Sequence, residues 1–328
     1  MSMKPYQYAL LEGVAQEMRK NKDICYYWEY ATPVATKPNG EVINIPKEFG
    51  GMPRTSGAGW AIDETWIVGA ATGAAAAGLP VIAQIPSMAQ IYPIEYVYNQ
   101  AAKLRHMTGG QATMPLVIWI DGGSRTRGSA GQHTEAGYES LYTHLPGIKV
   151  VVPSTAYDAK GLIAAAINDP DPVVFYDYPE VKAGALMDVP DEPYRVEIGK
   201  GVVRQEGTDL TLVAWAPATV DVTKALPGLK AAGLSVEVID PRTLKPLDLE
   251  MVLKSVKKTG KLLIVDHANW TNGFGSHIIA EVVQALPGVK TRRISFPDAP
   301  GPGAGNMMAW ARPDAPKIID AAKQMMKI

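Results

Sequence analysis

Two patterns of hydrophobic and polar positions alternate along this chain. Short runs made almost wholly of apolar residues, each about as long as a β-strand, are followed by longer stretches with the spacing of a helix. The apolar runs that predict strands are residues 23–28, 80–85, 115–121, 149–153 and 172–178 in the first half, and 210–215, 234–239 and 261–265 in the second. Strands that alternate with helices in this way predict an α/β protein whose parallel sheets are flanked by helices.

The break between two such sheets falls where the composition changes. Residues 179–195 are rich in proline, glutamate, aspartate and lysine, and 328 residues is a usual length for two domains. We therefore expect one domain at residues 1–185 and a second at residues 186–328. Helices are predicted at 6–20, 88–106 and 156–168, and in the second half from 218 onward and at 249–257, whereas 31–58 has the composition of a long loop.

Composition and charge narrow the classes of function. A net charge of −1 gives no reason to expect a nucleic acid or an anionic membrane as partner, and no apolar run reaches the roughly 20 residues of a spanning helix. Cys25 is the only cysteine, and the five histidines show no His-x-x-x-His spacing, which argues against a transition-metal site built by this chain. Because the start lacks the apolar core of a signal peptide, the sequence indicates a cytoplasmic enzyme.

One carboxylate stands directly before an unusual run of very small residues. Asp63 suits the N-cap of a helix, and Glu64 would then lie in its first turn. Gly69, Gly73 and Ala77 recur every four residues and share one helix face, which predicts a close, buried contact with another helix. The alternative is a plain alanine-rich core helix with an incidental carboxylate at its end.

A second carboxylate, Glu29, follows the first predicted strand. Ligands in parallel sheets bind outside the carboxyl ends of the strands, so this position suits a binding residue. A carboxylate exposed on the surface is the alternative.

The loop after residues 115–121 contains several further candidates. It is rich in glycine but lacks the P-loop pattern, so its similarity to a phosphate-binding loop is weak. Arg125 and Arg127 could hold an anionic substrate group, since arginine binds carboxylates through two hydrogen bonds, although a solvated loop tip is the simpler explanation. His133 is a candidate acid or base because histidine titrates near neutral pH. His144 follows, and a structural hydrogen bond is its simpler role.

Several of these segments resemble one family along nearly the whole chain. Residues 64–79 resemble, without a gap, the glutamate-containing small-residue stretch of the beta subunits of thiamine-dependent 2-oxo acid dehydrogenases. The other matching segments are 99–103, 132–134, 144–147, 151–162, 238–248 and 272–276. The resemblance implies a transketolase-like pyrimidine-binding domain followed by a transketolase C-terminal-like domain.

The resemblance also implies roles for particular residues. In the family, the glutamate at the position of Glu64 contacts the pyrimidine ring of thiamine diphosphate and promotes loss of the proton from its reactive carbon. The histidine at the position of His133 faces that reactive end. Glu29 is retained from a Gly-Glu-Asp strand end. The family's stacking phenylalanine is replaced, so Met88 or Ile91 is expected to pack on the pyrimidine instead.

A missing motif predicts a partner. Family enzymes bind the diphosphate through Mg²⁺ with a Gly-Asp-Gly motif, which this chain lacks. The resemblance therefore implies that an alpha subunit supplies the metal-binding half of the site, that two alpha and two beta subunits form a heterotetramer, and that this chain alone is inactive. A lipoyl acyltransferase is a possible further partner. The alternatives are a thiamine-dependent carbon–carbon lyase or ligase without lipoyl transfer, and a non-catalytic scaffold subunit.

Overall fold

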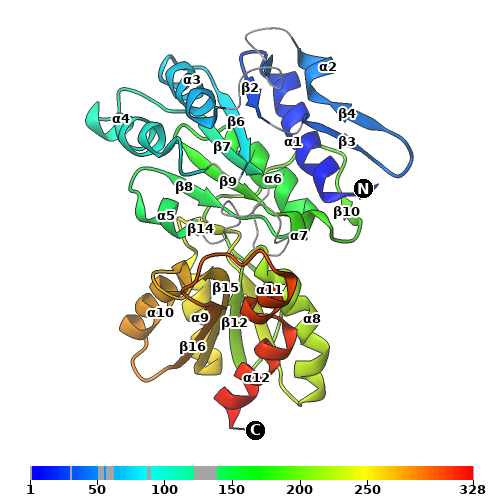
Figure 1. Ribbon diagram of the computed structural model, residues 1–328, viewed down its shortest axis with the longest axis vertical. Helices are drawn as coiled ribbons and strands as arrows, with labels where there is room; N and C mark the ends of the chain where they lie inside the picture. The colour runs from blue at the N-terminus through cyan, green and yellow to red at the C-terminus, as the bar shows by residue number, and fades with distance from the viewer. Residues whose placement is uncertain are drawn as a thin grey trace. The chain divides into compact units, whose positions relative to one another are not determined.

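The computed structural model describes residues 2–29, 32–50, 55–56, 63–86, 90–121 and 139–327. The chain divides into two compact units, and each is considered by itself. Among the described residues, the N-terminal unit contains those up to residue 121 and residues 142–198, and the C-terminal unit contains residues 139–141 and those from Gly199 onward. Figure 1 shows the first in blue to green and the second in yellow-green to red.

The N-terminal unit contains the predicted parallel sheet. Its strands lie side by side in the order β8-β9-β7-β6-β2-β5, and every neighbouring pair among them is parallel. The strands are β2 (Cys25–Trp28), β5 (Thr55–Ser56), β6 (Val81–Pro86), β7 (Leu116–Asp121), β8 (Lys149–Val151) and β9 (Val173–Asp177). The carboxyl ends of four of these strands, β2, β6, β7 and β9, therefore meet along one edge of the sheet.

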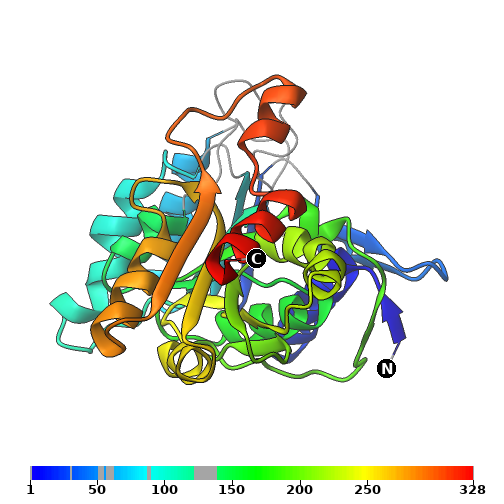
Figure 2. The ribbon, with the colours of Figure 1, turned by 90° about the horizontal axis from the view of Figure 1, so that it is seen from below.

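Helices pack on this sheet in two groups (Figures 1 and 2). The first group is α1 (Tyr6–Lys20) with α6 (Ala156–Ile167), and these two helices approach closely because Gly13 has no side chain: a Cβ there would lie 2.7 Å from the Lys160 carbonyl oxygen. The second group is α3 (Glu64–Ala76) with the π-helix η2 (Tyr96–Ala101), which continues as α4 (Ala102–Met107). The shorter helices are α5 (Glu139–His144) and α7 (Pro179–Lys182).

The structure departs from the expected elements in two places. The predicted loop at 31–58 contains a hairpin of β3 (Val34–Thr36) and β4 (Val42–Asn44), followed by α2 (Ile45–Phe49). These strands are too short to show a period in the sequence, and they form because Ala35 and Ile43 are buried beside α1. The helix expected from residue 88 begins only at residue 94.

The small-residue face of α3 is not the buried contact that its sequence suggests. At Gly69 the ring of Tyr96 on η2 fills the space of a side chain, since a Cβ there would lie 3.0 Å from its Cζ atom. Gly73 and Ala77 are exposed, and no other described atom lies within 4 Å of the Cβ position at Gly73. Helix packing covers this face at one end only, as far as the structure describes the chain.

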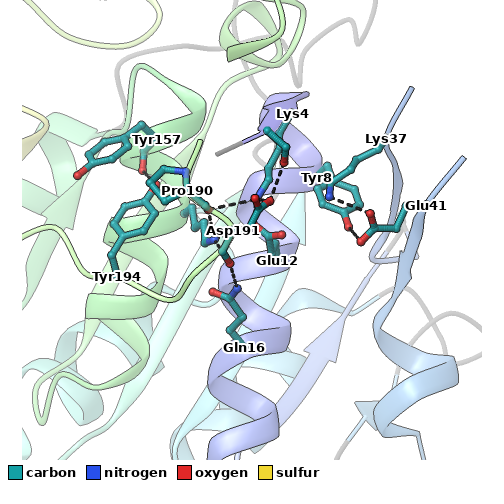
Figure 3. Close-up of polar contacts among 12 residues, drawn as sticks. Lys4, Tyr8, Glu12, Gln16, Lys37, Glu41, Tyr157, Pro190, Asp191 and Tyr194 are labelled. Carbon is teal, nitrogen blue, oxygen red and sulfur yellow. Dashed lines mark hydrogen bonds and ion pairs between the residues drawn. The ribbon is translucent and has the colours of Figure 1, made fainter. Parts of the chain in front are cut away.

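Residues 186–198, which follow the predicted boundary at 185/186, pack on the N-terminal unit (Figure 3). β10 (Met187–Val189) pairs antiparallel with β1 (Ser2–Lys4). The ammonium groups of Lys4 and Lys160 are fully buried, and both bind the Glu12 carboxylate and the Pro190 carbonyl oxygen. Residues 186–198 therefore belong to the N-terminal unit.

The C-terminal unit is a second α/β layer structure. Its sheet has the order β11-β13-β12-β15-β16, in which only the edge strand β11 is antiparallel. Helices α8 and α12 pack together on one face, and α9 and α10 pack on the other (Figure 2). The elements are β11 (Val202–Gln205), β12 (Leu210–Ala214), α8 (Ala218–Ala231), β13 (Val236–Asp240), β14 (Thr243–Lys245), α9 (Leu249–Thr259), β15 (Lys261–Asn269), α10 (Phe274–Ala285), β16 (Lys290–Phe296), α11 (Gly305–Ala311) and α12 (Ala315–Met326).

Among the helices that the structure describes, none is both long and apolar enough to cross a membrane.

Candidate functional site

Glu64 is fixed at the start of helix α3. The preceding residue, Asp63, has an extended backbone and caps the helix, because its side chain accepts a hydrogen bond from the Trp66 N–H at 2.9 Å. This is the cap that the sequence predicts. Glu64 is the first helical residue and is 7% exposed. The free N–H groups of the first turn carry partial positive charge, so the backbone favours a carboxylate here.

Glu29 lies next to this helix start. It follows β2 directly, and its N–H donates to the Gln84 carbonyl oxygen of β6 at 3.0 Å. Its side chain is buried, and neither carboxylate oxygen has a hydrogen-bond partner within normal geometry among the described residues. Burial, and then the charge of Glu64, raises the pKa of Glu29 to about 7; the Asp63 N–H acts weakly in the opposite direction.

Glu29 can exchange a proton at neutral pH, because its pKa lies at about 7. Burial disfavours its charged form, and the charge of the neighbouring Glu64 disfavours it further. The unpaired oxygens of Glu29 can accept hydrogen bonds from a ligand. A heterocycle with a basic ring nitrogen or an amino group, such as an aminopyrimidine, fits this donor and acceptor set.

A second polar cluster lies along the same carboxyl edge of the sheet. Asp121 and Asp177 are the last residues of the neighbouring strands β7 and β9, and the Lys182 ammonium on α7 binds both carboxylates. Gln84 donates to Asp121 at 2.8 Å, and Trp119 donates to Asp177 at 3.2 Å. Burial raises the pKa of Asp177 to about 6 despite the opposing charge of Lys182.

Sequence reasoning did not single out this second cluster. A faint signal is present, because an aspartate ends each of two strong apolar runs, at Asp121 and Asp177. The cation that joins the two aspartates is 61 residues beyond Asp121, and no local pattern marks it.

Of the other residues that the sequence suggests for the site, the structure describes two, Ile91 and His144. Ile91 lies in the turn before the helix at residue 94 and is 42% exposed. His144 is the last residue of α5 and is exposed, and its ring makes no hydrogen bond to another described residue. Four more candidates lie outside the described residues: Met88, Arg125, Arg127 and His133.

No group of three or more acidic, histidine or cysteine side chains is placed to hold a metal ion in the described parts of the chain. The carboxylates of Asp121 and Asp177 at the sheet edge are instead paired with Lys182.

Comparison with known proteins gives a consistent family. The family model of the transketolase pyrimidine-binding domain matches residues 9–177, and that of the transketolase C-terminal domain matches residues 199–318. Two curated relatives are similar along most of their length. The pyruvate dehydrogenase E1 component subunit beta of Acholeplasma laidlawii is 38% identical over 279 residues, which cover 84% of this chain and 82% of that protein. The acetoin:2,6-dichlorophenolindophenol oxidoreductase subunit beta of Cupriavidus necator is 37% identical over 272 residues, covering 81% and 79%.

A solved structure supports the fold. The structure described as a split gene transketolase, inactive beta4 tetramer, matches this chain with a TM-score of 0.77 and covers 98% of both chains. The two sequences are 20% identical, so this likeness concerns the fold alone.

Proposed function

Because this chain belongs to the family of dehydrogenase E1 beta subunits, which join a transketolase pyrimidine-binding domain to a transketolase C-terminal domain, we propose that it is the beta subunit of a thiamine diphosphate-dependent 2-oxo acid dehydrogenase or a related acetoin dehydrogenase. The observation that carries the proposal is the buried carboxyl pair of Glu29 and Glu64 at the carboxyl edge of the sheet. The relatives differ in their substrates, so the proposal leaves the choice between a 2-oxo acid and acetoin to a substrate screen.

The roles of the residues follow from their chemistry. When bound, thiamine diphosphate supplies a carbon nucleophile that attacks the carbonyl next to the bond to be cleaved. Glu64 would hydrogen-bond to the pyrimidine ring nitrogen, and Glu29, whose pKa is raised to about 7, would hold or release a proton beside it at neutral pH. His133 would transfer protons at the substrate, and Arg125 or Arg127 would bind its carboxylate.

The proposal includes a partner that completes the site. This chain has no Gly-Asp-Gly motif, so an alpha subunit would hold most of the ligands to Mg²⁺ and to the diphosphate. Two alpha and two beta subunits would then assemble, and the acyl product would pass to the lipoyl group of an acyltransferase. If the partner subunit supplies the metal ligands, the carboxylates at the carboxyl edge of this sheet need not bind a metal ion themselves. Glu29 and Asp177, whose pKa values are raised, lie at this edge, and the described residues contain no metal-binding group of three.

The proposal is tested by exchange of the C2 proton of thiamine diphosphate in the purified complex with its partner, followed by NMR after quenching. We expect Glu64→Gln to slow this exchange by at least about 100-fold, as loss of a general acid or base does. Asp63→Asn is the matched control, because asparagine still caps α3. The isolated beta chain should neither bind the cofactor nor exchange its proton.

Two results would contradict the proposal. If the exchange rate of the Glu64→Gln complex equals that of the wild type, Glu64 does not have the assigned role. Turnover by the beta chain in the complete absence of a partner would show that the site is not shared between subunits.

A further inference from the structure

The turn that precedes η2 is held by two buried tyrosines. Gln90 lies in this turn, is 2% exposed and stands next to the exposed Ile91. The Tyr176 hydroxyl donates to the Gln90 side-chain oxygen at 2.7 Å, and the Tyr142 hydroxyl donates to the Gln90 carbonyl oxygen. Side chain and backbone of one residue are thus held by separate donors.

These donors come from two elements that are far apart in the sequence. Tyr142 lies on α5, and Tyr176 is the last residue but one of β9. Their rings are in contact, with centroids 6.4 Å apart and an interplanar angle of 66°. Tyr176 is stacked on Tyr178 as well, with centroids 5.7 Å apart. All three rings are buried.

The chemistry of the two bonds is suited to a permanent contact. Burial raises the pKa of Tyr142, so its hydroxyl remains a proton donor throughout the physiological pH range. Both acceptors are neutral amide oxygens, which do not titrate. Residues 91–93 form a turn before the first helical residue, and at its far end the Val97 N–H donates to the Pro93 carbonyl oxygen at 3.2 Å. The tyrosine hydroxyls hold the other end of the turn, at Gln90.

We propose that Tyr142 and Tyr176 are positioning residues, which hold Gln90 and thereby present the neighbouring Ile91 to the pyrimidine ring of thiamine diphosphate. The part that concerns the cofactor rests on the proposed function. We call the group of Gln90, Tyr142 and Tyr176 the clamp. The observation that supports the clamp itself is the pair of hydrogen bonds from the two tyrosine hydroxyls to Gln90, and it does not depend on the proposed function.

The test uses Tyr142→Phe and Tyr176→Phe, since each removes one oxygen atom and keeps the ring. Hydrogen–deuterium exchange of the full chain reports the amides of residues 90–97, and a fluorescence titration with thiamine diphosphate and Mg²⁺ reports cofactor affinity in the complex with the partner subunit. We expect each variant to speed amide exchange in this segment by about fivefold and to weaken cofactor binding by about the same factor, as the loss of one net hydrogen bond does.

The controls separate positioning from general stability. Tyr8→Phe removes another buried hydroxyl, whose acceptor is Glu41, in the same unit but at the hairpin of β3 and β4. It should leave both readouts unchanged. Gln90→Met removes the Tyr176 bond from the other side, so combining it with Tyr176→Phe should add nothing to either single effect.

Each remaining outcome is decisive. Unchanged amide exchange in both tyrosine variants overturns the clamp. Faster exchange with unchanged cofactor affinity overturns its role in positioning Ile91. A wild-type complex that binds no thiamine diphosphate overturns the proposed function and the cofactor role together, while the exchange data still decide whether the clamp exists.

Discussion

At the scale of single residues, the most consequential group is the carboxyl of Glu29. It lies buried beside a second carboxyl group, Glu64, and its pKa of about 7 stands well above the ordinary value of 4.5. A buried acid of this kind costs stability whenever it must ionise. Natural chains retain such groups where a proton is needed, so the cost is itself a sign of a working site.

This cost predicts a pH dependence. Between pH 4.5 and pH 7 the folded chain binds a proton at Glu29 that the unfolded chain has lost, so the free energy of unfolding decreases as the pH rises through this window. Glu29→Gln removes the penalty. Its free energy of unfolding should match that of the wild type near pH 4.5 and exceed it by up to about 3 kcal/mol at pH 8.

Urea unfolding of both proteins at pH 5 and pH 8 checks this prediction. The difference between the two proteins is the relevant quantity, because Asp177 and Asp266 also have raised pKa values. A difference that is the same at both pH values would mean that Glu29 does not hold the proton.

Local rules explain which of these residues could be predicted from the sequence. Asp63 and Glu64 follow the rule for a helix start, and Glu29 follows the rule that binding residues come after a strand. Asp177, Lys182 and the clamp at Gln90 follow no such rule, because each depends on a side chain that folding brings from another part of the chain. The local sequence pattern can point to one residue of such a contact, but it does not show which distant residue that side chain will meet.

At the scale of elements, the close approach of two segments depends on one glycine. Gly147 lies in the turn between α5 and β8 with a positive φ of 88°, and a Cβ there would lie 1.9 Å from the Ala102 carbonyl oxygen of α4. Gly78, after α3, has a similar φ of 92° but has open space around it. The two turns therefore separate the effect of backbone strain from that of a steric clash.

Alanine substitutions should measure both effects. Gly78→Ala should lower the free energy of unfolding by about 1 kcal/mol, since only backbone strain is added. Gly147→Ala should lower it by at least about 3 kcal/mol, because α4 must also move away from the turn. Thermal unfolding of the two variants is the measurement. Equal losses would show that the turn can shift without disturbing α4.

The elements that the pattern predicted are those with a long or strongly apolar signal. Every strand predicted in the sheets is present, and helices at 6–20 and 156–168 are present within a residue or two. The hairpin of β3 and β4, the late helix start at residue 94 and the π-helical turns of η2 were not predictable, because short strands and extra helical residues leave no clear period.

At the scale of the whole chain, residues 186–198 belong to the N-terminal unit through buried ionic contacts. Lys160 donates to Glu12 at 2.7 Å and to the Pro190 carbonyl oxygen at 2.6 Å, and Lys4 shares these acceptors. Tyr194 stacks on Tyr157 a little further along. Composition alone marks a linker near this position, but the structure fixes the segment on α1 and α6.

Removal of the Lys160 ammonium should release this segment. Lys160→Met leaves Glu12 and the Pro190 carbonyl oxygen with Lys4 as their remaining cationic donor. It removes charge-assisted hydrogen bonds in a buried place, so it should lower the free energy of unfolding by about 2–3 kcal/mol. Arg195→Met is the matched control. Its ion pair with Glu17 is exposed on the arginine side, so we expect a loss of at most about 1 kcal/mol.

Limited proteolysis of the full chain follows the segment directly. Cleavage within residues 186–198 should become faster in Lys160→Met and remain at the wild-type rate in Arg195→Met. If both variants are cut as slowly as the wild type, the ionic contacts do not hold the segment in place.

The pairing of β1 with β10 has a consequence for the order of events at the ribosome. The first strand and the underside of α1 receive their partners, Lys160 and residues 187–191, only when nearly two hundred residues have been made. At about 5–20 residues per second this takes roughly 10–40 s. The apolar residues of α1, among them Leu10, Leu11 and Val14, are fully buried in the finished chain. Because α1 packs mainly on α6, part of this surface lacks its cover on the nascent polypeptide until residues 156–167 have been made, and it is then open to capture by a chaperone.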